Sequence, residues 1–165
     1  MADRVTISKL DEDHWQDYQD LRLEALKNEP LAFSSSFEEE QLIPESAWRQ
    51  NINNVLFAKL DNMPVGMIGF FCNNRCKTKH VCEIYGVYVR REYRGRGIGK
   101  LMLDAALAEI KNLKGIIKIK IGVNPTQKAA EHLYRKYGFK AVGRLTKEMC
   151  VNGAFYDELW MEKFV

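Results

Sequence analysis

The chain has 165 residues, of which 46% are hydrophobic and 28% are charged, and its net charge is +3. These values are typical of a soluble globular protein, and we expect one domain over residues 1–165. The small net charge gives no support for binding to nucleic acid or to a membrane, and no uncharged stretch is long enough to span a bilayer. Because the N-terminus lacks the apolar core of a signal peptide, we expect a cytoplasmic protein.

The first half of the chain predicts a strand, two helices and a pair of strands. Alternating or continuous apolar residues indicate the strands, and apolar residues at helical spacing indicate the helices. The polar stretch between the two helices, residues 32–40, is expected to be irregular. The expected elements are a strand over 4–10, helices over 12–29 and 44–52, and strands over 55–60 and 64–72.

The second half predicts a strand, a helix, another strand, another helix and a final hairpin. Asn152-Gly153 is a strong hairpin signal, because a type I′ turn needs a positive φ at both positions. Thr126 is expected to cap the second helix and Gly138 to end it. The expected elements are a strand over 81–89, a helix from Ile98, a strand over 115–123, a helix over 124–138, and two strands around residues 151–154.

This order of elements, β-α-α-β-β-β-α-β-α-β-β, determines the predicted fold class. Strands and helices are mixed along the chain, and several successive strands follow one another without a helix between them. An α/β fold is therefore expected, with a mixed, mostly antiparallel sheet and helices on both faces.

The four cysteines allow more than one interpretation. Cys72, Cys76, His80 and Cys82 lie close together in the sequence, but one residue between His80 and Cys82 is a tight spacing for zinc ligands. We expect free thiols and no metal site, because the cytosol is reducing. A zinc site and a structural disulfide are the alternatives.

A glycine-rich segment, "RGRGIGK", follows the strand over 81–89 and opens the helix from Ile98. Free backbone amides and the helix dipole attract an anion at such a turn, and glycines let a phosphate approach the backbone. The spacing differs from that of a P-loop and from that of the dinucleotide fingerprint. We therefore expect a pyrophosphate site of another kind; the alternative is a tight turn with solvated arginines.

The same segment resembles the Arg/Gln-x-x-Gly-x-Gly/Ala signature of the GNAT N-acetyltransferase superfamily. Two further blocks support the resemblance: "VYV" before the turn, and "NPTQKAAEHLYRKYGF" after the next strand. The order of strands is similar along the whole chain. The resemblance implies one acetyltransferase domain over residues 1–165, with acetyl-coenzyme A as co-substrate.

The resemblance also implies which residues bind the coenzyme. Backbone amides of the glycine turn would hold the pyrophosphate, the main chain of a splayed strand would pair with the pantetheine arm, and the side chain of an asparagine would bond its amides. In this sequence the implied residues are Val87, Val89, Arg94, Gly95, Arg96, Gly97, Ile98, Gly99, Lys100 and Asn124.

Acetyl transfer to an amine requires that the amine lose a proton and that the leaving thiolate be stabilised. Glu83 is the candidate base, because alternation places it on one strand face with Tyr85, Val87 and Val89, and because its spacing resembles that of the family's glutamate. It could also only orient water, or be an exposed strand residue. Tyr134 matches the family's tyrosine near the coenzyme sulfur and is the candidate acid; a core tyrosine is the alternative.

The three histidines show no spacing typical of a nucleophile–base pair, so we expect direct attack of the amine in a ternary complex. The acceptor is a small-molecule amine or a peptide or protein amine, bound near residues 30–40 and 149–158. Glu38, Glu39 and Glu40 could favour a cationic amine or could form a solvated helix start. A homodimer and a non-catalytic acyl-coenzyme A sensor or scaffold are the further alternatives.

Overall fold

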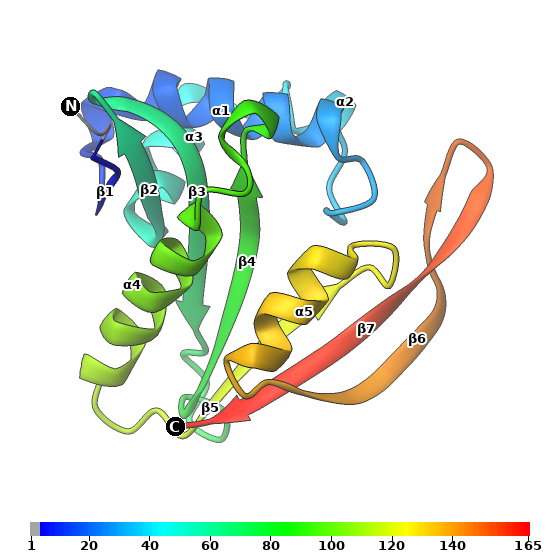
Figure 1. The fold of residues 1–165 in the computed structure, drawn as a ribbon. Coiled ribbons are helices and arrows are strands. Elements are labelled where there is room, and N and C mark those ends of the chain that lie inside the picture. Colours follow the sequence, from blue (N-terminus) through cyan, green and yellow to red (C-terminus); the bar gives the residue numbers. More distant parts are fainter. Residues whose placement is uncertain (1–3) are drawn as a thin grey trace.

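The computed structural model describes residues 4–165, so residues 1–3 of the predicted domain lie outside the described part. Its centre is a seven-stranded sheet with the strand order β1-β2-β3-β4-β5-β7-β6 (Figure 1). All neighbouring strands are antiparallel except β4 and β5, which confirms the predicted mixed, mostly antiparallel sheet. The strands are β1 Thr6–Ser8, β2 Val55–Leu60, β3 Met63–Cys72, β4 Val81–Val89, β5 Lys118–Val123, β6 Lys140–Val151 and β7 Ala154–Phe164.

Helices cover both faces of this sheet, as predicted. A core that includes Leu21, Trp48 and Phe57 fills the face beneath α1 and α3, and a core that includes Met102, Ile121 and Tyr134 fills the face beneath α4 and α5. The helices are α1 Trp15–Asn28, α2 Phe37–Glu40, α3 Glu45–Asn51, α4 Ile98–Asn112 and α5 Lys128–Lys136, with 3₁₀ turns at Glu12–His14, Ile52–Asn54 and Arg91–Tyr93. Within residues 4–165, no helix is both long and apolar enough to cross a membrane.

The short helix α2 corrects the prediction of an irregular segment over residues 32–40. The Ser36 hydroxyl accepts a hydrogen bond from the Glu39 amide at 3.2 Å, and the Glu39 carboxylate accepts one from the Ser36 amide at 3.1 Å. This reciprocal capping box satisfies amides that would otherwise be free at the start of the helix. Local side-chain bonding thus forms a helical turn that hydrophobic spacing does not indicate.

β4 and β5 diverge in the middle of the sheet. Their parallel pairing runs from Val81–Lys118 to Ile84–Ile121 and ends there. Beyond that point β4 still pairs with β3, and β5 still pairs with β7. Within residues 4–165, one edge of β4 therefore has no strand partner from Tyr85 onward, and we call the unpaired stretch beyond Ile84 and Ile121 the gap. The splayed strand implied by the family resemblance is present.

A β-bulge at Gly86 changes which face the end of β4 presents. Gly86 has a φ of +63°, and the register with β3 shifts beside it. Val87 and Val89 consequently pack against the core beneath α4, whereas Glu83 and Tyr85 line a cleft on the opposite face. The predicted sharing of one face by all four residues is wrong, because the extra residue of a bulge shifts the two-residue alternation of a strand.

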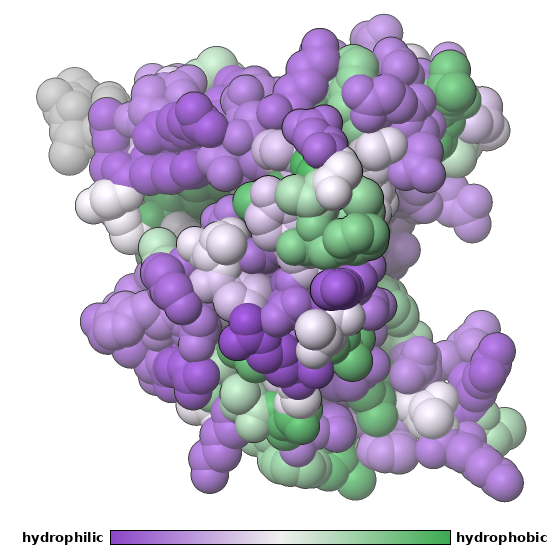
Figure 2. Space-filling model, turned by 90° about the vertical axis from the view of Figure 1, so that its right-hand side faces the viewer, coloured by the Kyte–Doolittle hydropathy of each residue, from purple (hydrophilic) through white to green (hydrophobic). Residues whose placement is uncertain are grey.

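β6 and β7 form a long hairpin that extends away from the rest of the sheet (Figure 1). Asn152 and Gly153 at its tip have φ angles of +51° and +78°, which confirms the predicted turn. Val142 and Phe155 on the hairpin are exposed apolar residues. On the face of the molecule that Figure 2 shows, hydrophilic residues cover most of the surface, and hydrophobic residues gather near its centre and its lower edge.

A disulfide joins Cys72 on β3 to Cys82 on β4. The prediction of free thiols is wrong for this pair, because the register of β3 and β4 places the two residues directly opposite each other. Cys76 and Cys150 are free and exposed. Within residues 4–165, no group of three or more His, Cys, Asp or Glu side chains is arranged to hold a metal ion.

Candidate active site

The turn between β4 and α4 presents a run of free backbone amides. Gly95 and Gly97 have φ angles of +77° and +78°, and Gly97 caps α4 without a side-chain hydrogen bond. The run ends at Leu101, whose amide donates to the Gly97 carbonyl at 3.1 Å. Within residues 4–165, the amides from Gly95 to Lys100 form no hydrogen bond. Together with the dipole of the 15-residue helix, they are a favourable place for an anion.

The positive side chains around this turn have different roles. Arg94 Nε donates to the Val89 carbonyl at 2.8 Å, and its Nη2 lies 2.9 Å from Glu29 Oε1, so the side chain fastens the turn to β4 and to the end of α1. Arg96 lies over the Tyr93 ring and is exposed. Arg96 Nη2 also donates to the Glu92 carbonyl at 3.3 Å, a longer bond than those of Arg94. The exposed side chains of Arg96 and Lys100 are accessible to an incoming phosphate.

Asn124 follows the last residue of β5 and is only 4% exposed. Its Oδ1 accepts hydrogen bonds from the Thr126 amide at 2.9 Å and from the Thr126 hydroxyl at 2.7 Å. Its Nδ2 is buried and has no partner within residues 4–165. A buried donor without an acceptor costs free energy unless a ligand completes it, so Asn124 is suited to bind a carbonyl of the coenzyme arm.

The same contacts correct the predicted cap of α5. Thr126 donates its hydroxyl to Asn124 instead of accepting from the helix, and the residue at the cap position is Gln127, without a side-chain cap. The predicted end of the helix is confirmed, since Gly138 has a φ of +84°.

Tyr134 lies on the inner side of α5, in the core beneath α4 and α5. It is 4% exposed, and its ring meets that of Phe139 edge-on at a centroid distance of 6.1 Å. Burial raises the pKa of the Tyr134 hydroxyl, which therefore stays protonated at neutral pH. Tyr137, on the same helix, donates its hydroxyl to Asp104 Oδ1 at 2.6 Å and so links α5 to α4.

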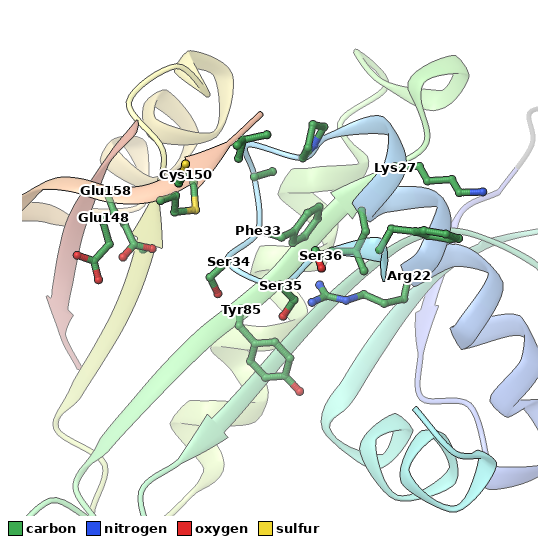
Figure 3. A pocket seen from close by; sticks show the side chains of 18 of the residues that line it. Arg22, Lys27, Phe33, Ser34, Ser35, Ser36, Tyr85, Glu148, Cys150 and Glu158 are labelled. Atoms are coloured by element: carbon green, nitrogen blue, oxygen red, sulfur yellow. The ribbon is translucent and has the colours of Figure 1, made fainter. Parts of the chain in front are cut away.

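A cleft of about 1080 Å³ opens on the opposite face of the sheet. Its walls come from α1, the segment before α2, the middle of β4 and the β6–β7 hairpin (Figure 3). Among its charged lining residues are four carboxylates and two cations. The carboxylates are Glu38, Glu83, Glu148 and Glu158, and the cations are Arg22 and Lys27.

A buried ion pair supports one end of this cleft. Arg22 donates from Nε and Nη2 to the two carboxylate oxygens of Glu40, at 2.9 and 2.6 Å. The guanidinium also lies over the Phe33 ring, 4.8 Å from its centroid. The three neighbouring glutamates thus have three roles: Glu38 lines the cleft, Glu39 caps α2, and Glu40 binds Arg22.

Glu83 and Glu158 lie at the other end of the cleft, near the gap. Glu83 forms an ion pair with Lys120, whose Nζ is 3.3 Å from Glu83 Oε2. Glu158 lies over Gly122, and its pKa is raised by burial and by the charges of Glu148 and Glu83. In the sequence, Glu158 is the last residue of the segment 149–158, near which the acceptor is expected to bind. No motif singles out Glu158 itself.

The residues predicted from sequence are therefore distributed over both faces of the sheet. Glu83 lines the cleft, whereas Tyr134 belongs to the opposite core. The amides before α4 and the free amide group of Asn124 lie at the ends of the strands that border the gap. The strand pairing between β4 and β5 ends at the same level of the sheet, after Ile84 and Ile121.

Comparison with known proteins identifies relatives of this fold. The sequence profile described as the acetyltransferase (GNAT) family matches residues 9–139. The L-2,4-diaminobutyric acid acetyltransferase of Streptomyces avermitilis is 28% identical over 98 residues, which are 59% of this chain and 54% of that protein. The chain thus spans about half the length of this relative.

Solved structures show the same architecture. An acetyltransferase of the GNAT family from Streptococcus pneumoniae has a TM-score of 0.87 and 20% identity, and the match covers 98% of this chain and 100% of that one. YncA from Salmonella typhimurium, solved with its cofactor acetyl-CoA, has a TM-score of 0.83 and 17% identity, with coverage of 98% and 94%. At these identities the similarity concerns the fold.

Proposed function

This chain belongs to the acetyltransferase (GNAT) family, and from that premise we propose that it is an N-acetyltransferase that moves the acetyl group of acetyl-coenzyme A to a primary amine. The observation that carries the proposal is the run of free amides from Gly95 to Lys100 beside an unpaired edge of β4. Such a run suits a pyrophosphate followed by an amide-containing arm, which are the two recognisable parts of coenzyme A.

Residues around the gap would hold the coenzyme. The amides from Gly95 to Lys100 would bind the pyrophosphate, and the exposed side chains of Arg96 and Lys100 would add positive charge. The main chain of Val87 and the amide of Val89 would pair with the pantetheine arm, since the Val89 carbonyl already accepts a hydrogen bond from Arg94 Nε. Asn124 Nδ2 would donate to one of the carbonyls of the arm. When bound, acetyl-coenzyme A supplies the acetyl group as a thioester.

Side chains of this protein would carry out two proton transfers, one from the substrate ammonium and one to the leaving thiolate. A carboxylate of the cleft would take a proton from the substrate ammonium, because only the neutral amine has a lone pair for attack. Glu83 is the carboxylate that sequence analysis proposes. The hydroxyl of Tyr134 would donate a proton to the leaving thiolate. Transfer would be direct, with amine and coenzyme bound together.

The charge of the cleft supports a cationic acceptor. Four carboxylates face two cations, and one of those cations, Arg22, is neutralised by Glu40. A primary ammonium is stabilised in such surroundings before it gives up its proton. The name of the Streptomyces avermitilis relative indicates a diamino acid as substrate for that protein. Small diamines and basic amino acids are therefore the first candidates here.

An acceptor screen tests the proposal. The purified protein is mixed with acetyl-coenzyme A and single amines: diamino acids, polyamines, amino acids, aminoglycosides and peptides with free N-termini. Released thiol is measured. We expect release that depends on at least one amine and on the protein. Coenzyme binding by calorimetry with no amine-dependent release would favour the non-catalytic alternative.

A further inference from the structure

Glu158 is the carboxylate of the cleft that lies at the edge of the gap. A Cβ atom placed on Gly122 would be 2.6 Å from Glu158 Oε1, so the carboxylate occupies the space that a side chain at position 122 would fill. Gly122 is the first residue of β5 beyond the last β4–β5 pair. Because Gly122 has no side chain, the Glu158 carboxylate can lie beside the gap.

The groups that face Glu158 carry mainly negative charge. Glu83 on β4 and Glu148 on β6 both act on it electrostatically. Lys120 on β5 is engaged elsewhere, with its Nζ 3.3 Å from Glu83 Oε2 and 4.8 Å from the centroid of the Trp160 ring. Within residues 4–165, Glu158 forms no ion pair. Burial and these two carboxylates raise the pKa of Glu158, and a side-chain hydrogen bond with Trp160 opposes them. The net shift is upward, which makes Glu158 a better proton acceptor at neutral pH.

The cations of the cleft lie at its far end (Figure 3). Arg22 is held by Glu40, and Lys27 lies over the Phe37 ring, 4.0 Å from its centroid. Glu38 is the further carboxylate on that side. An ammonium that enters the cleft therefore meets its most negative surroundings near the gap.

We propose that Glu158 is the proton acceptor of the reaction, an inference that rests on the proposed function. The substrate ammonium gives one proton to the Glu158 carboxylate, and the freed lone pair on nitrogen forms a bond to the acetyl carbonyl carbon. The carbon–sulfur bond breaks, its electron pair stays on sulfur, and the thiolate takes a proton from Tyr134 or from water. The nitrogen still carries one proton more than the amide product, and this proton replaces the one that Tyr134 or water gave up. Glu158 then releases its proton to solvent through the open cleft.

Glu83 is less suited to this step, although sequence analysis selects it. Its carboxylate is already engaged by Lys120, whose Nζ lies 3.3 Å from Glu83 Oε2, so it is less available to contact a substrate ammonium. Its negative charge has another effect, since it raises the proton affinity of Glu158. Glu83 is thus a positioning residue that acts through Glu158.

The test compares Glu158→Gln, Glu83→Gln and a control, Glu162→Gln. Glu162 is on the same strand and pairs with Lys118, away from the cleft. For each protein, kcat/KM for the best amine of the screen is measured against pH. Carbon-13 NMR of carboxyl-labelled glutamate, recorded without coenzyme, follows each carboxyl group directly.

For Glu158→Gln we expect kcat/KM to fall by about 100-fold at neutral pH, with loss of the acidic limb of the profile that the wild type shows. The NMR signal that titrates above the ordinary glutamate range should disappear. Glu83→Gln should keep that signal but move it to lower pH, and the kinetic limb should move with it. Glu162→Gln should match the wild type.

The outcomes separate this inference from the proposed function. A wild type that transfers acetyl groups, together with a Glu158→Gln variant within threefold of it and with the same limb, overturns only the role of Glu158. A wild type without transfer to any amine overturns both. If Glu158→Gln does not fold, Gly122→Ala displaces the carboxylate while keeping its charge, and an unchanged rate in that variant would contradict the assignment.

Discussion

At the scale of single residues, the anion site depends on two backbone angles. Gly95 and Gly97 have φ angles of +77° and +78°, which cost a residue with a side chain about 1–2 kcal/mol. No atom lies within 4 Å of a Cβ built on either residue. The need for glycine therefore comes from the backbone and from the ligand that approaches it, and not from packing within the protein.

Gly97→Val should greatly weaken the binding of acetyl-coenzyme A, because the branched side chain strains the turn and occupies the approach of the phosphate. Calorimetry measures the dissociation constant. Gly115→Val is the matched control: Gly115 has a φ of +83° and open space around it, but lies at the other end of α4. The Gly115→Val variant should lose about as much unfolding free energy as Gly97→Val but should bind acetyl-coenzyme A with the affinity of the wild type. Equal affinities of the two variants would contradict the site.

Tyr134→Phe should lower kcat by about 100-fold and leave KM for acetyl-coenzyme A nearly unchanged, because the hydroxyl acts on the leaving thiolate in the transition state. The ring and its contact with Phe139 are kept, so the melting temperature should change little. Steady-state kinetics with an accepted amine provides the measurement.

Tyr137→Phe is the control for this variant. It removes the hydrogen bond to Asp104 and should cost about 1 kcal/mol of stability without a change in kcat. A fall in kcat of less than about threefold in Tyr134→Phe, well short of the scale of general acid catalysis, would mean that Tyr134 is only a core residue.

At the scale of elements, the bulge in β4 determines which residues of this strand lie on each face of the sheet. Before Gly86 the odd-numbered residues face the cleft, and after it they face the core beneath α4. The divergence of β4 from β5 begins at the same level of the sheet. One strand thus contributes a carboxylate to the cleft and a main-chain edge to the proposed coenzyme site.

Gly86→Ala should lose about 1–2 kcal/mol of unfolding free energy, because alanine is strained at a φ of +63°. The added Cβ would lie 3.5 Å from Arg22 Nη1, an ordinary contact, so the cost should come from the backbone. Urea unfolding measures it. Gly143→Ala on β6, with open space and no positive φ, is the control and should lose less than half as much. Similar losses in both variants would argue against a bulge that depends on glycine.

At the scale of the whole molecule, the sheet separates two hydrophobic cores and also two halves of the site. The cleft lies on the side of α1 and the hairpin, and the residues proposed to bind the coenzyme lie toward the side of α4 and α5. Glu158 lies between these two sides and is partly buried only in the folded protein. Its protonation therefore affects the free energy of unfolding.

The pH dependence of the melting temperature should reveal the effect of the Glu158 charge on stability. The pKa of Glu158 is raised by folding, so the proton is bound more tightly in the folded state. Its contribution to stability is full below the ordinary glutamate pKa and is lost as pH rises through the raised value. Glu158→Gln should therefore melt at a higher temperature than the wild type at pH 8, and the difference should shrink toward pH 4. A variant that is less stable at pH 8 would contradict the raised pKa.

Much of the fold and part of the site follow from the sequence by itself. The Asn152-Gly153 turn, the helix from Ile98 and the glycine turn before it are set by local preferences, which neighbouring residues determine. The order of strands and helices and the family resemblance follow from the same local signals. The amides from Gly95 to Lys100 could be predicted as an anion site for this reason.

Only the tertiary structure decided the features that depend on strand register. The bulge at Gly86, the disulfide between Cys72 and Cys82, and the position of Glu158 over Gly122 each join residues of different strands. A shift of one residue in pairing reverses the face of every later side chain, and no local pattern in the sequence fixes such a shift. Alternation along β4 and the family spacing therefore point to Glu83 as the proton acceptor, whereas the packed sheet brings Glu158 to the edge of the gap.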